Sequence, residues 1–513
     1  MFSFGGSIVR DGALVDNELV DAKQIQITLG PIVGPGRVVI GRTGTGVYDS
    51  DAFTLARGTP DAIVFPTSTD EMARVVRALN GLNATIVTRG SGTGLAGGAA
   101  PWGHRTTPDH RTPGPVVLLS TSRMTEIFDI DTKSRFAHVQ AGVLNGVLND
   151  AVAAAQSAAP ADGTGPLHFA PDPSSARAST IGGNAATNAG GVHTLKDFVT
   201  SNHVYGLRLV LPNGEILTTG GRDGATHQGP FDLTGLLCGS EGTLGIITEL
   251  WVKLSVKREG WRTLLALFDT TRAACQAVSS VIAAGILPAA MEMLDGTMVR
   301  VIENAYHFGI PEGTRAMLVV ELDGEDALLG GELAVVREFL SASGATEIRE
   351  AHSLDERAKL WKARKSAFGA IGKLSHSYCT QDACVPRSKL GDVLEMIIAV
   401  GEKYGLTISN VFHAGDGNVH PIFLYDDTNP AEVARAMSAC AEVLEGAIAA
   451  GGTITGEHGV GVEKVGLMAR LFDAPTLSTF NAVKRAFDPA RKWNPGKLLP
   501  DEEHDYAVIR VGV

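Results

Sequence analysis

Two histidines lie close together in the stretch VFHAGDGNVHPI, residues 411–422. Asp416 and Gly417 form a dipeptide that is strongly favoured as the two-residue turn of a β-hairpin. With that turn, His413 faces His420 across the hairpin. Directly opposed residues have Cβ atoms roughly 4.5 to 5.5 Å apart, so both imidazoles can hold one cation. The hairpin therefore predicts part of a metal site.

The stretch TGEHGVG at 455–461 offers the remaining groups of such a site. Glu457 supplies a carboxylate as the third ligand, and His458 beside it is a spare histidine. We expect both on a strand that follows a helix at 431–450. Three protein ligands with an open position are typical of reactive metal centres. The set suits Zn, Mn and Fe alike, so the identity of the divalent metal stays open.

The size and charge of the chain limit its class. With 513 residues it is too long for one compact core, and two or three domains are expected. Its 61 glycines occur largely in tight clusters, which indicates backbone packed closely against a ligand. The formal net charge is −12, and no block of Lys and Arg offsets it. Nucleic-acid binding is not expected, because it needs a basic surface for the phosphates.

The cysteine pattern predicts a reduced, cytoplasmic protein. The N-terminus carries Arg10, Asp11 and Asp16 and lacks the continuous hydrophobic region of a signal peptide. No segment is apolar and long enough to span a bilayer directly. The cysteines are odd in number, scattered and without CxxC spacing: Cys238, Cys275, Cys379, Cys384 and Cys440.

A glycine-rich loop, RGSGTGLAGG at 89–98, contains the GxGxxG pattern of dinucleotide-binding folds. Its context differs from that pattern, because no helix follows and no acidic residue closes a βαβ unit about twenty residues later. A run of backbone N–H groups unhindered by side chains can still wrap a pyrophosphate. Taken alone, the loop is equally consistent with a glycine-rich surface loop.

The character of the chain changes near residue 257. Before it, short strands alternate with helices, including a helix that we expect over 68–82. After it, longer strands separated by amphipathic helices predict an α+β domain on an antiparallel sheet. The polar segment FDPARKWNPGKLLP at 487–500 is broken by prolines and predicts a tail that docks back on another domain.

Two further stretches join the glycine loop: PDPSSARASTIGGNAATNAGG at 171–191 and CGSEGTLGIITEL at 238–250. With PDAIVFP at 60–66, they resemble the FAD-binding domain of the vanillyl-alcohol-oxidase type flavoproteins. The second half contains LWKARKSAFGAIG, TQDACVP, HAGDGNVHP, GEHGVG and NPGK. This set resembles the group of glycolate oxidase FAD subunits and D-lactate and D-2-hydroxyglutarate dehydrogenases.

The resemblance implies an α+β fold in three parts. Residues 1–256 would form a two-part FAD-binding domain of the vanillyl-alcohol-oxidase type. Residues 257–450 would form an antiparallel-sheet α+β substrate (cap) domain that carries the metal hairpin. Residues 451–513 would return to the flavin and the active site.

The resemblance also implies which residues bind FAD. The glycine loop would hold the pyrophosphate, the stretch 171–191 would line the flavin, two isoleucines would border the adenine side, and two tail residues would reach the isoalloxazine. The glycine loop contains neither histidine nor cysteine, so FAD is expected to bind noncovalently. The predicted residues are Arg89, Gly90, Ser91, Gly92, Thr93, Gly94, Leu95, Gly97, Pro171, Ser179, Thr180, Gly182, Gly183, Asn188, Gly190, Gly191, Ile246, Ile247, Asn494 and Lys497.

The implied reaction is oxidation of a short 2-hydroxy acid to the 2-oxo acid. It needs a cation for the carboxylate, a base for the hydroxyl proton and a hydride acceptor. By the resemblance, Arg364, on a helix at 360–371, binds the carboxylate, and the predicted metal chelates the hydroxyl and carboxylate oxygens. His458 is then the general base, and flavin N5 takes the hydride.

Three positions favour a small substrate. Enzymes of the group that take 2-hydroxyglutarate carry polar or cationic residues for its distal carboxylate, and here those positions are Phe368, Thr380 and Ile422. Burying a second carboxylate without a partner would cost several kcal/mol, so a monocarboxylate is favoured. Glycolate is expected first, with D-lactate as the alternative.

Other functions and partners stay open. A non-redox flavin-dependent transferase of the same fold is one alternative, and a flavin subunit that only scaffolds a complex is another. The chain has no cluster motif of its own, so the resemblance implies an iron–sulfur subunit as electron acceptor. Such a subunit would place the protein peripherally at the inner membrane. The oligomeric state, including a homodimer, is not determined by the sequence.

Overall fold

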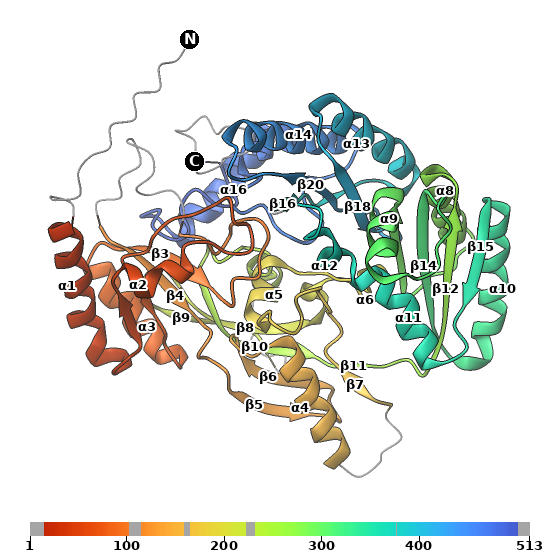
Figure 1. Ribbon diagram of the computed structural model, residues 1–513. Helices are drawn as coiled ribbons and strands as arrows, with labels where there is room; N and C mark the ends of the chain where they lie inside the picture. Colours follow the sequence, from red (N-terminus) through yellow and green to blue (C-terminus); the bar gives the residue numbers. More distant parts are fainter. Residues whose placement is uncertain (1–14, 102–113, 159–164, 222–230, 376, 501–513) are drawn as a thin grey trace.

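The computed structural model describes residues 15–101, 114–158, 165–221, 231–375 and 377–500 (Figure 1). The first half of the chain forms two main sheets and a two-stranded one, and the second half forms a larger sheet. The smallest of the three main sheets has the order β1-β2-β4-β3, in which β2, β4 and β3 are parallel. Its strands are β1 (Val38–Ile40), β2 (Ala62–Val64), β3 (Thr85–Arg89) and β4 (Val116–Ser120).

Two helices pack against this sheet: α1 (Val15–Val33) and α3 (Thr69–Gly81). The helix expected over 68–82 is confirmed as α3. Ser68 is its N-cap and accepts a hydrogen bond from the backbone N–H of Glu71, which satisfies an otherwise unpaired amide. Its buried side chains recur at helical spacing, at Met72, Val75, Val76 and Leu79.

The second sheet is antiparallel and has the order β5-β6-β10-β8-β9. Helix α5 (Ile181–Thr187) packs on it and lies near the middle of the molecule in Figure 1. The strands are β5 (Ile127–Asp131), β6 (Phe136–Gln140), β8 (Val204–Val210), β9 (Ile216–Gly220) and β10 (Ile246–Lys253). Short elements around it are α4 (Asn145–Ala158), α6 (Thr194–Asp197), α7 (Leu233–Leu237), β7 (Leu167–His168) and β11 (Ser255–Val256).

The second half is built on a nine-stranded antiparallel sheet, as the sequence predicts, and we call this half the cap. Its main path is β15-β12-β14-β13-β18-β19-β17, and β20 joins β18 to β16. The strands are β12 (Gly260–Phe268), β13 (Ala290–Asp295), β14 (Ala316–Gly324), β15 (Ala345–Glu350), β16 (Ser377–Thr380), β17 (Ala383–Cys384), β18 (Ile408–His413), β19 (Asn418–Val419) and β20 (Pro421–Tyr425).

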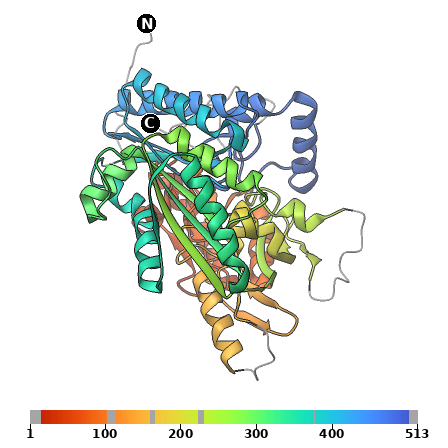
Figure 2. The ribbon, with the colours of Figure 1, turned by 90° about the vertical axis from the view of Figure 1, so that its right-hand side faces the viewer.

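Helices cover both faces of the cap sheet (Figures 1 and 2). Alternate residues of a strand point to opposite faces, so Leu264 and Ala266 enter one core while Leu265 and Leu267 enter the other. The first core is closed by α8 (Thr271–Ala283), α10 (Asp326–Ala342), α13 (Leu390–Tyr404) and α14 (Pro430–Ala449). The second is closed by α9 (Gly296–Tyr306), α11 (Leu354–Lys365) and α12 (Ala367–Ile371).

The segment after helix α16 (Ala474–Phe487) returns to the first sheet, which confirms the predicted docking of the tail. Trp493 forms a parallel bridge with Ile86 of β3, and the Asn494 amide donates to the Ile86 carbonyl at 2.8 Å. The Trp493 side chain is 1% exposed and packs in the core of that sheet. The end of the chain is therefore part of the wall behind the glycine loop.

Among the described residues, no helix combines the length and apolar character that crossing a bilayer requires.

Candidate active site

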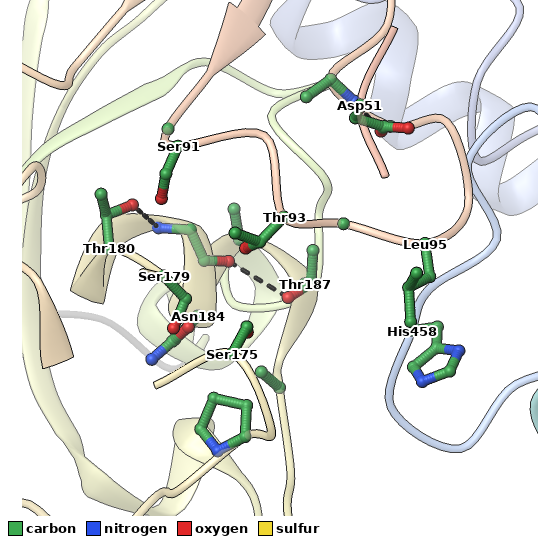
Figure 3. A pocket seen from close by; sticks show the side chains of 18 of the residues that line it. Asp51, Ser91, Thr93, Leu95, Ser175, Ser179, Thr180, Asn184, Thr187 and His458 are labelled. Carbon is green, nitrogen blue, oxygen red and sulfur yellow. Dashed lines mark hydrogen bonds between the residues drawn. The ribbon is translucent and has the colours of Figure 1, made fainter. Parts of the chain in front are cut away.

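A cavity of about 900 Å³ lies between the first half and the cap. Its walls combine all three glycine-rich stretches with residues of the cap (Figure 3). In Figure 3, Ser179, Thr180 and Asn184 lie on one side of the cavity, and Leu95 and His458 lie on the other. The predicted cofactor residues that line it are Arg89, Gly90, Ser91, Gly92, Thr93, Gly94, Leu95, Ser179, Thr180, Gly182, Gly183, Ile246 and Ile247.

The glycine loop leaves β3 and forms one wall of this cavity. No helix follows it before residue 101, as expected. Within the described part of the chain, the backbone amides of residues 90–95 donate to no backbone carbonyl. Amides that face a cavity without a partner are donors available to an anionic ligand.

Two polar side chains support the presence of a ligand on the opposite wall. Ser179 Oγ and Asn184 Nδ2 are buried, line the cavity and have no hydrogen-bond partner among the described residues. Buried polar atoms are rarely left unpaired, because each costs about 1–3 kcal/mol. The cavity therefore fits a group with several hydrogen-bonding atoms, as a dinucleotide has.

Five predicted cofactor residues lie outside the cavity lining and support its walls. Asn188 ends α5 in the left-handed region, and its Oδ1 accepts from the Ser201 amide at 2.8 Å. Pro171 accepts from Asn145 through its carbonyl. The other three are Gly97, Gly190 and Gly191, at which an added Cβ would meet Val462, Glu457 and Asp172 respectively.

The two predicted tail residues also bind the chain itself. Asn494 is fully buried and donates to Thr88 Oγ1 at 2.8 Å and to the Glu241 carbonyl at 3.0 Å. Lys497 Nζ donates to the carbonyls of Gly98 and Ala100 at 2.8 and 2.7 Å. Neither lines the cavity, so their contacts anchor the glycine loop from behind.

The hairpin of the predicted metal site has a different register from the expected one. His413 pairs with Asn418, not with His420, and residues 414–417 form a four-residue turn. The turn is set by tertiary contacts, because the Val385 amide donates to the Gly417 carbonyl and the Gly415 amide to the Met291 carbonyl. A shift of two residues keeps side chains on the same face of a strand. The rings of His413 and His420 therefore still meet, with centroids 5.1 Å apart.

The structure brings the three predicted metal ligands together. The Nε2 atoms of His413 and His420 lie 3.2 and 3.5 Å from Oε1 of Glu457. The three groups form a set whose ligand atoms all lie within 4.8 Å of one another. Burial opposes ionisation of Glu457, yet the neighbouring His413 lowers its pKa to about 2. The cluster therefore presents a carboxylate and two imidazoles to one point.

His458 lies beside this cluster and lines the cavity. Its ring stacks on that of His420 at 4.8 Å, and its Nε2 lies 3.9 Å from Glu457 Oε1. Burial lowers the pKa of His458 to about 4, so the imidazole is neutral at neutral pH. The remaining nitrogen, Nδ1, has no partner among the described residues.

Glu457 and His458 lie on a loop, so the prediction of a strand is wrong. The loop follows a single bridge between Thr453 and Cys384. Its backbone amides are held by the buried carboxylate of Asp382, which accepts from Gly456 and His458 at 2.9 Å each. Strand pairing is not needed, because side-chain oxygens satisfy the amides.

Two buried carboxylates of this region were not predicted from the sequence. Asp382 binds the amides of the loop just described, and Glu241 accepts from the amides of Val460 and Gly461 at 2.7 Å each. Asp382 stands in TQDACVP and Glu241 in CGSEGTLG, two stretches that contribute to the family resemblance. An acidic residue within an apolar, glycine-rich stretch is the signal that marks such carboxylates.

Arg364 lies at the end of α11, and the predicted helix 360–371 is divided into α11 and α12 at Ser366. The side chain is buried, lines the cavity and donates from Nε to Oε2 of Glu292 at 2.7 Å. Glu292 lies in β13 within AMEMLD, and sequence reasoning overlooks this acidic residue in an apolar strand. Arg364 therefore joins the other site residues at one cavity.

The three positions used to judge substrate size differ in their surroundings. Thr380 lines the cavity, whereas Ile422 is fully buried in the apolar core closed by α9 and α12. The side chain of Phe368 lies outside the described ones. Thr380 is thus the position of the three that the structure places on the cavity wall.

Two family models match the chain. Residues 60–220 match the FAD binding domain, and residues 258–498 match the C-terminal domain of FAD linked oxidases. A glycolate oxidase subunit GlcD of Escherichia coli is 40% identical over 491 residues, which cover 96% of this chain and 93% of the relative. The chain belongs to the FAD-linked oxidases. It is an FAD-linked oxidoreductase with a two-part FAD-binding domain and a cap, as the motifs predict.

A second relative and two solved structures extend the comparison. A D-lactate dehydrogenase of Archaeoglobus fulgidus is 31% identical over 441 residues, covering 85% of this chain and 91% of the relative. The structure of p-cresol methylhydroxylase with substrate bound has a TM-score of 0.75 at 17% identity, covering 96% of this chain and 99% of the other. An alkyldihydroxyacetonephosphate synthase has a TM-score of 0.68 at 17% identity over 92% and 84%. At such identities the solved structures show the fold alone.

The Gly92→Ala variant of this FAD-linked oxidase should bind FAD at least tenfold more weakly. Gly92 has a φ of +75°, and an added Cβ would meet the guanidinium of Arg89. Strain of about 1–2 kcal/mol at positive φ, together with displacement of Arg89, would deform the loop that faces the cofactor. Equilibrium dialysis of the apoprotein against FAD measures the affinity.

Gly309→Ala is the matched control for that variant. Gly309 has a φ of +71°, nothing within 4 Å of an added Cβ and no place in the cavity wall. This variant should be less stable than wild type because of the backbone strain, and its affinity for FAD should be unchanged. Equal affinity in Gly92→Ala and Gly309→Ala would contradict the placement of the glycine loop against the cofactor.

Proposed function

We propose that this protein oxidises a short 2-hydroxy acid, with glycolate favoured, to the 2-oxo acid in an FAD- and metal-dependent reaction. The observation that carries the proposal is the convergence of Arg364, His458 and the His413, His420 and Glu457 cluster beside one cavity. These groups are the cation, the base and the ligand set that such a reaction needs.

The three-residue cluster fits a divalent metal. Donors about 2.0–2.1 Å from a tetrahedral ion are about 3.4 Å apart. The two distances from Glu457 Oε1 to the imidazole nitrogens are 3.2 and 3.5 Å, close to the separation that one such ion requires. Two imidazoles and a carboxylate suit Zn, Mn or Fe, and the choice among them is left to experiment.

Each residue has a defined task in the proposed reaction. When bound, FAD supplies the hydride acceptor, and the divalent cation supplies a Lewis acid that lowers the pKa of the substrate hydroxyl. Arg364 binds the substrate carboxylate through its guanidinium fork. His458, neutral because it is buried, accepts the hydroxyl proton at Nε2, the nitrogen on the side of Glu457.

Glycolate is proposed ahead of D-lactate on similarity to relatives, and a monocarboxylate is proposed ahead of a dicarboxylate on the lining of the cavity. The glycolate oxidase subunit is 40% identical to this chain and the D-lactate dehydrogenase 31%. Thr380 on the cavity wall offers no positive charge for a distal carboxylate. Ile422 carries no weight in this choice, because its side chain packs in the apolar core.

We expect glycolate to bleach the flavin fastest when the protein is mixed anaerobically with single substrates. D-lactate should follow, and L-lactate and D-2-hydroxyglutarate should react at least tenfold more slowly, because the site has one carboxylate-binding arginine and a fixed base. Stopped-flow absorbance of the flavin measures the rates. Absence of bleaching by every 2-hydroxy acid would overturn the proposal and favour a non-redox transferase of this fold.

A partner completes the proposed reaction cycle. We propose that the reduced flavin passes its electrons to an iron–sulfur subunit, because the chain has no cluster motif of its own and its E. coli relative is named as a subunit. Such a partner would hold the protein peripherally at the inner membrane. The proposal predicts slow reoxidation by oxygen compared with an added one-electron acceptor.

A further inference from the structure

The carboxylate of Glu292 binds two residues of the site at once. Glu292 lies on β13 directly opposite His413 of β18 and is fully buried. His413 Nδ1 donates to its Oε1 at 2.6 Å, and Arg364 Nε donates to its Oε2 at 2.7 Å. Each carboxylate oxygen therefore receives one donor, from a residue with a different task.

A buried carboxylate such as that of Glu292 is stable only where hydrogen-bond donors pair with its oxygens. An unpaired carboxylate in the interior of a sheet is strongly unfavourable, and removal of one partner of a buried ion pair is typically costly. A methionine or leucine would fill this apolar strand, AMEMLD, without any such demand. The two short contacts thus indicate that the position of Glu292 serves the two residues it holds.

The contact with Arg364 determines what that side chain offers to the cavity. Nε is occupied by Glu292, and the described residues supply no acceptor for the two terminal nitrogens. Those nitrogens are the pair that forms a fork with a carboxylate. Glu292 thereby holds the guanidinium in one orientation and leaves its terminal edge available.

The contact with His413 determines which of its nitrogens can bind a cation. Because the carboxylate only accepts hydrogen bonds, Nδ1 of His413 must carry the proton. A neutral ring then has its lone pair on Nε2, the atom that faces Glu457 at 3.2 Å. A carboxylate behind a ligating histidine in this way orients the ring and raises its basicity.

We infer that Glu292 is a positioning residue that couples the carboxylate-binding arginine to the metal-binding histidine. The inference rests on the proposed function, because it assigns Glu292 to that site. In this coupling, the side chain of Glu292 sets the distance and orientation between the two points at which a 2-hydroxy acid is held. Loss of this carboxylate should weaken metal binding and substrate binding together.

The Glu292→Gln variant tests this coupling. An amide has one oxygen, so it cannot accept from both His413 and Arg364, and its NH2 group would face one of the two donors. We expect the dissociation constant for Zn²⁺ or Mn²⁺, measured by calorimetric titration of the FAD-loaded protein, to rise about 10–100-fold. KM for glycolate should rise about tenfold or more, while kcat at saturating metal and glycolate changes less than KM.

Glu321→Gln is the matched control. Glu321 lies on the neighbouring strand β14, is 2% exposed and accepts from Arg357, Trp361 and Thr263, none of which lines the cavity. It should lose stability as a buried ion pair does and keep the metal dissociation constant and KM. Glu292→Asp keeps the charge but is one bond of ~1.5 Å shorter, so it should give a smaller loss in both quantities.

The outcomes of these experiments distinguish a failure of the proposed coupling from a failure of the proposed function. If wild type binds the metal and glycolate but Glu292→Gln and Glu292→Asp leave both constants unchanged, the inference is overturned and the proposed function stands. A change in metal affinity without a change in KM would overturn the coupling. Wild-type protein that binds none of Zn²⁺, Mn²⁺ and Fe²⁺ would overturn both.

Discussion

The His458→Ala variant should reduce its flavin with glycolate about 10³-fold more slowly than wild type. A general base contributes roughly 10²–10⁴-fold. Among the described residues, the other histidine that lines the cavity is His420, whose Nε2 lies 3.3 Å from Asp382 and 3.5 Å from Glu457. The His458 side chain stacks on His420, and its Nδ1 has no hydrogen-bond partner among the described residues, so its removal should leave the cluster in place. Anaerobic stopped-flow absorbance measures the rate.

Chemical rescue separates the loss of a base from a general disturbance of the site. Alanine leaves a space of imidazole size, so added imidazole should restore part of the rate in His458→Ala. His203→Ala is the control, because His203 is also a buried histidine with an unpaired Nδ1 but lies outside the cavity lining. An unchanged rate of flavin reduction in His458→Ala would remove His458 from the mechanism.

Removal of the metal should abolish turnover while the flavin stays bound. After treatment with a chelator, we expect flavin reduction by glycolate to fall about 10³-fold or more, because the hydroxyl loses its Lewis acid and Arg364 alone holds the substrate. The visible spectrum of FAD should persist, since the glycine loops do not use the cluster. Titration with Zn²⁺, Mn²⁺ or Fe²⁺ under anaerobic conditions should restore the rate and identify the metal.

Two variants of the hairpin sharpen that experiment. His420→Ala should reproduce the loss seen on chelation, because it removes one of three ligands. Asp416→Asn should keep activity within a few-fold, because Asp416 accepts a local hydrogen bond from the Asn418 amide and belongs to no ligand set among the described residues. Full activity in chelated protein, or equal losses in both variants, would contradict the assignment of His413, His420 and Glu457.

Features with local causes could be predicted from the sequence. Helix α3 begins at Thr69 because the preceding Ser68, followed by acidic residues, caps an amphipathic stretch, and that chemistry acts within one helical turn. Successive residues of the cap strands enter two apolar cores in turn, so these strands can be recognised in the sequence as apolar stretches. The glycine loop, the two histidines of the hairpin and the docking tail likewise carry short motifs.

Features with distant causes needed the tertiary structure. The register of the hairpin is set by Val385 and Met291, which hold the turn from neighbouring strands. A loop replaces the expected strand at Glu457 because the carboxylate of Asp382, more than seventy positions earlier, satisfies its amides. Asn494 and Lys497 support the glycine loop from about 400 positions away.

The sequence by itself indicated the kind of chemistry proposed here. The residue types and short contexts of His413, His420, Glu457 and His458 favour a metal and a base, and the family resemblance adds Arg364 as a carboxylate clamp. The tertiary structure alone decided that these groups meet at one cavity and that Glu292 joins two of them. The physical reason is that a buried carboxylate has no local signature of its partners. Its energy depends on donors that only the folded sheet brings within 3 Å.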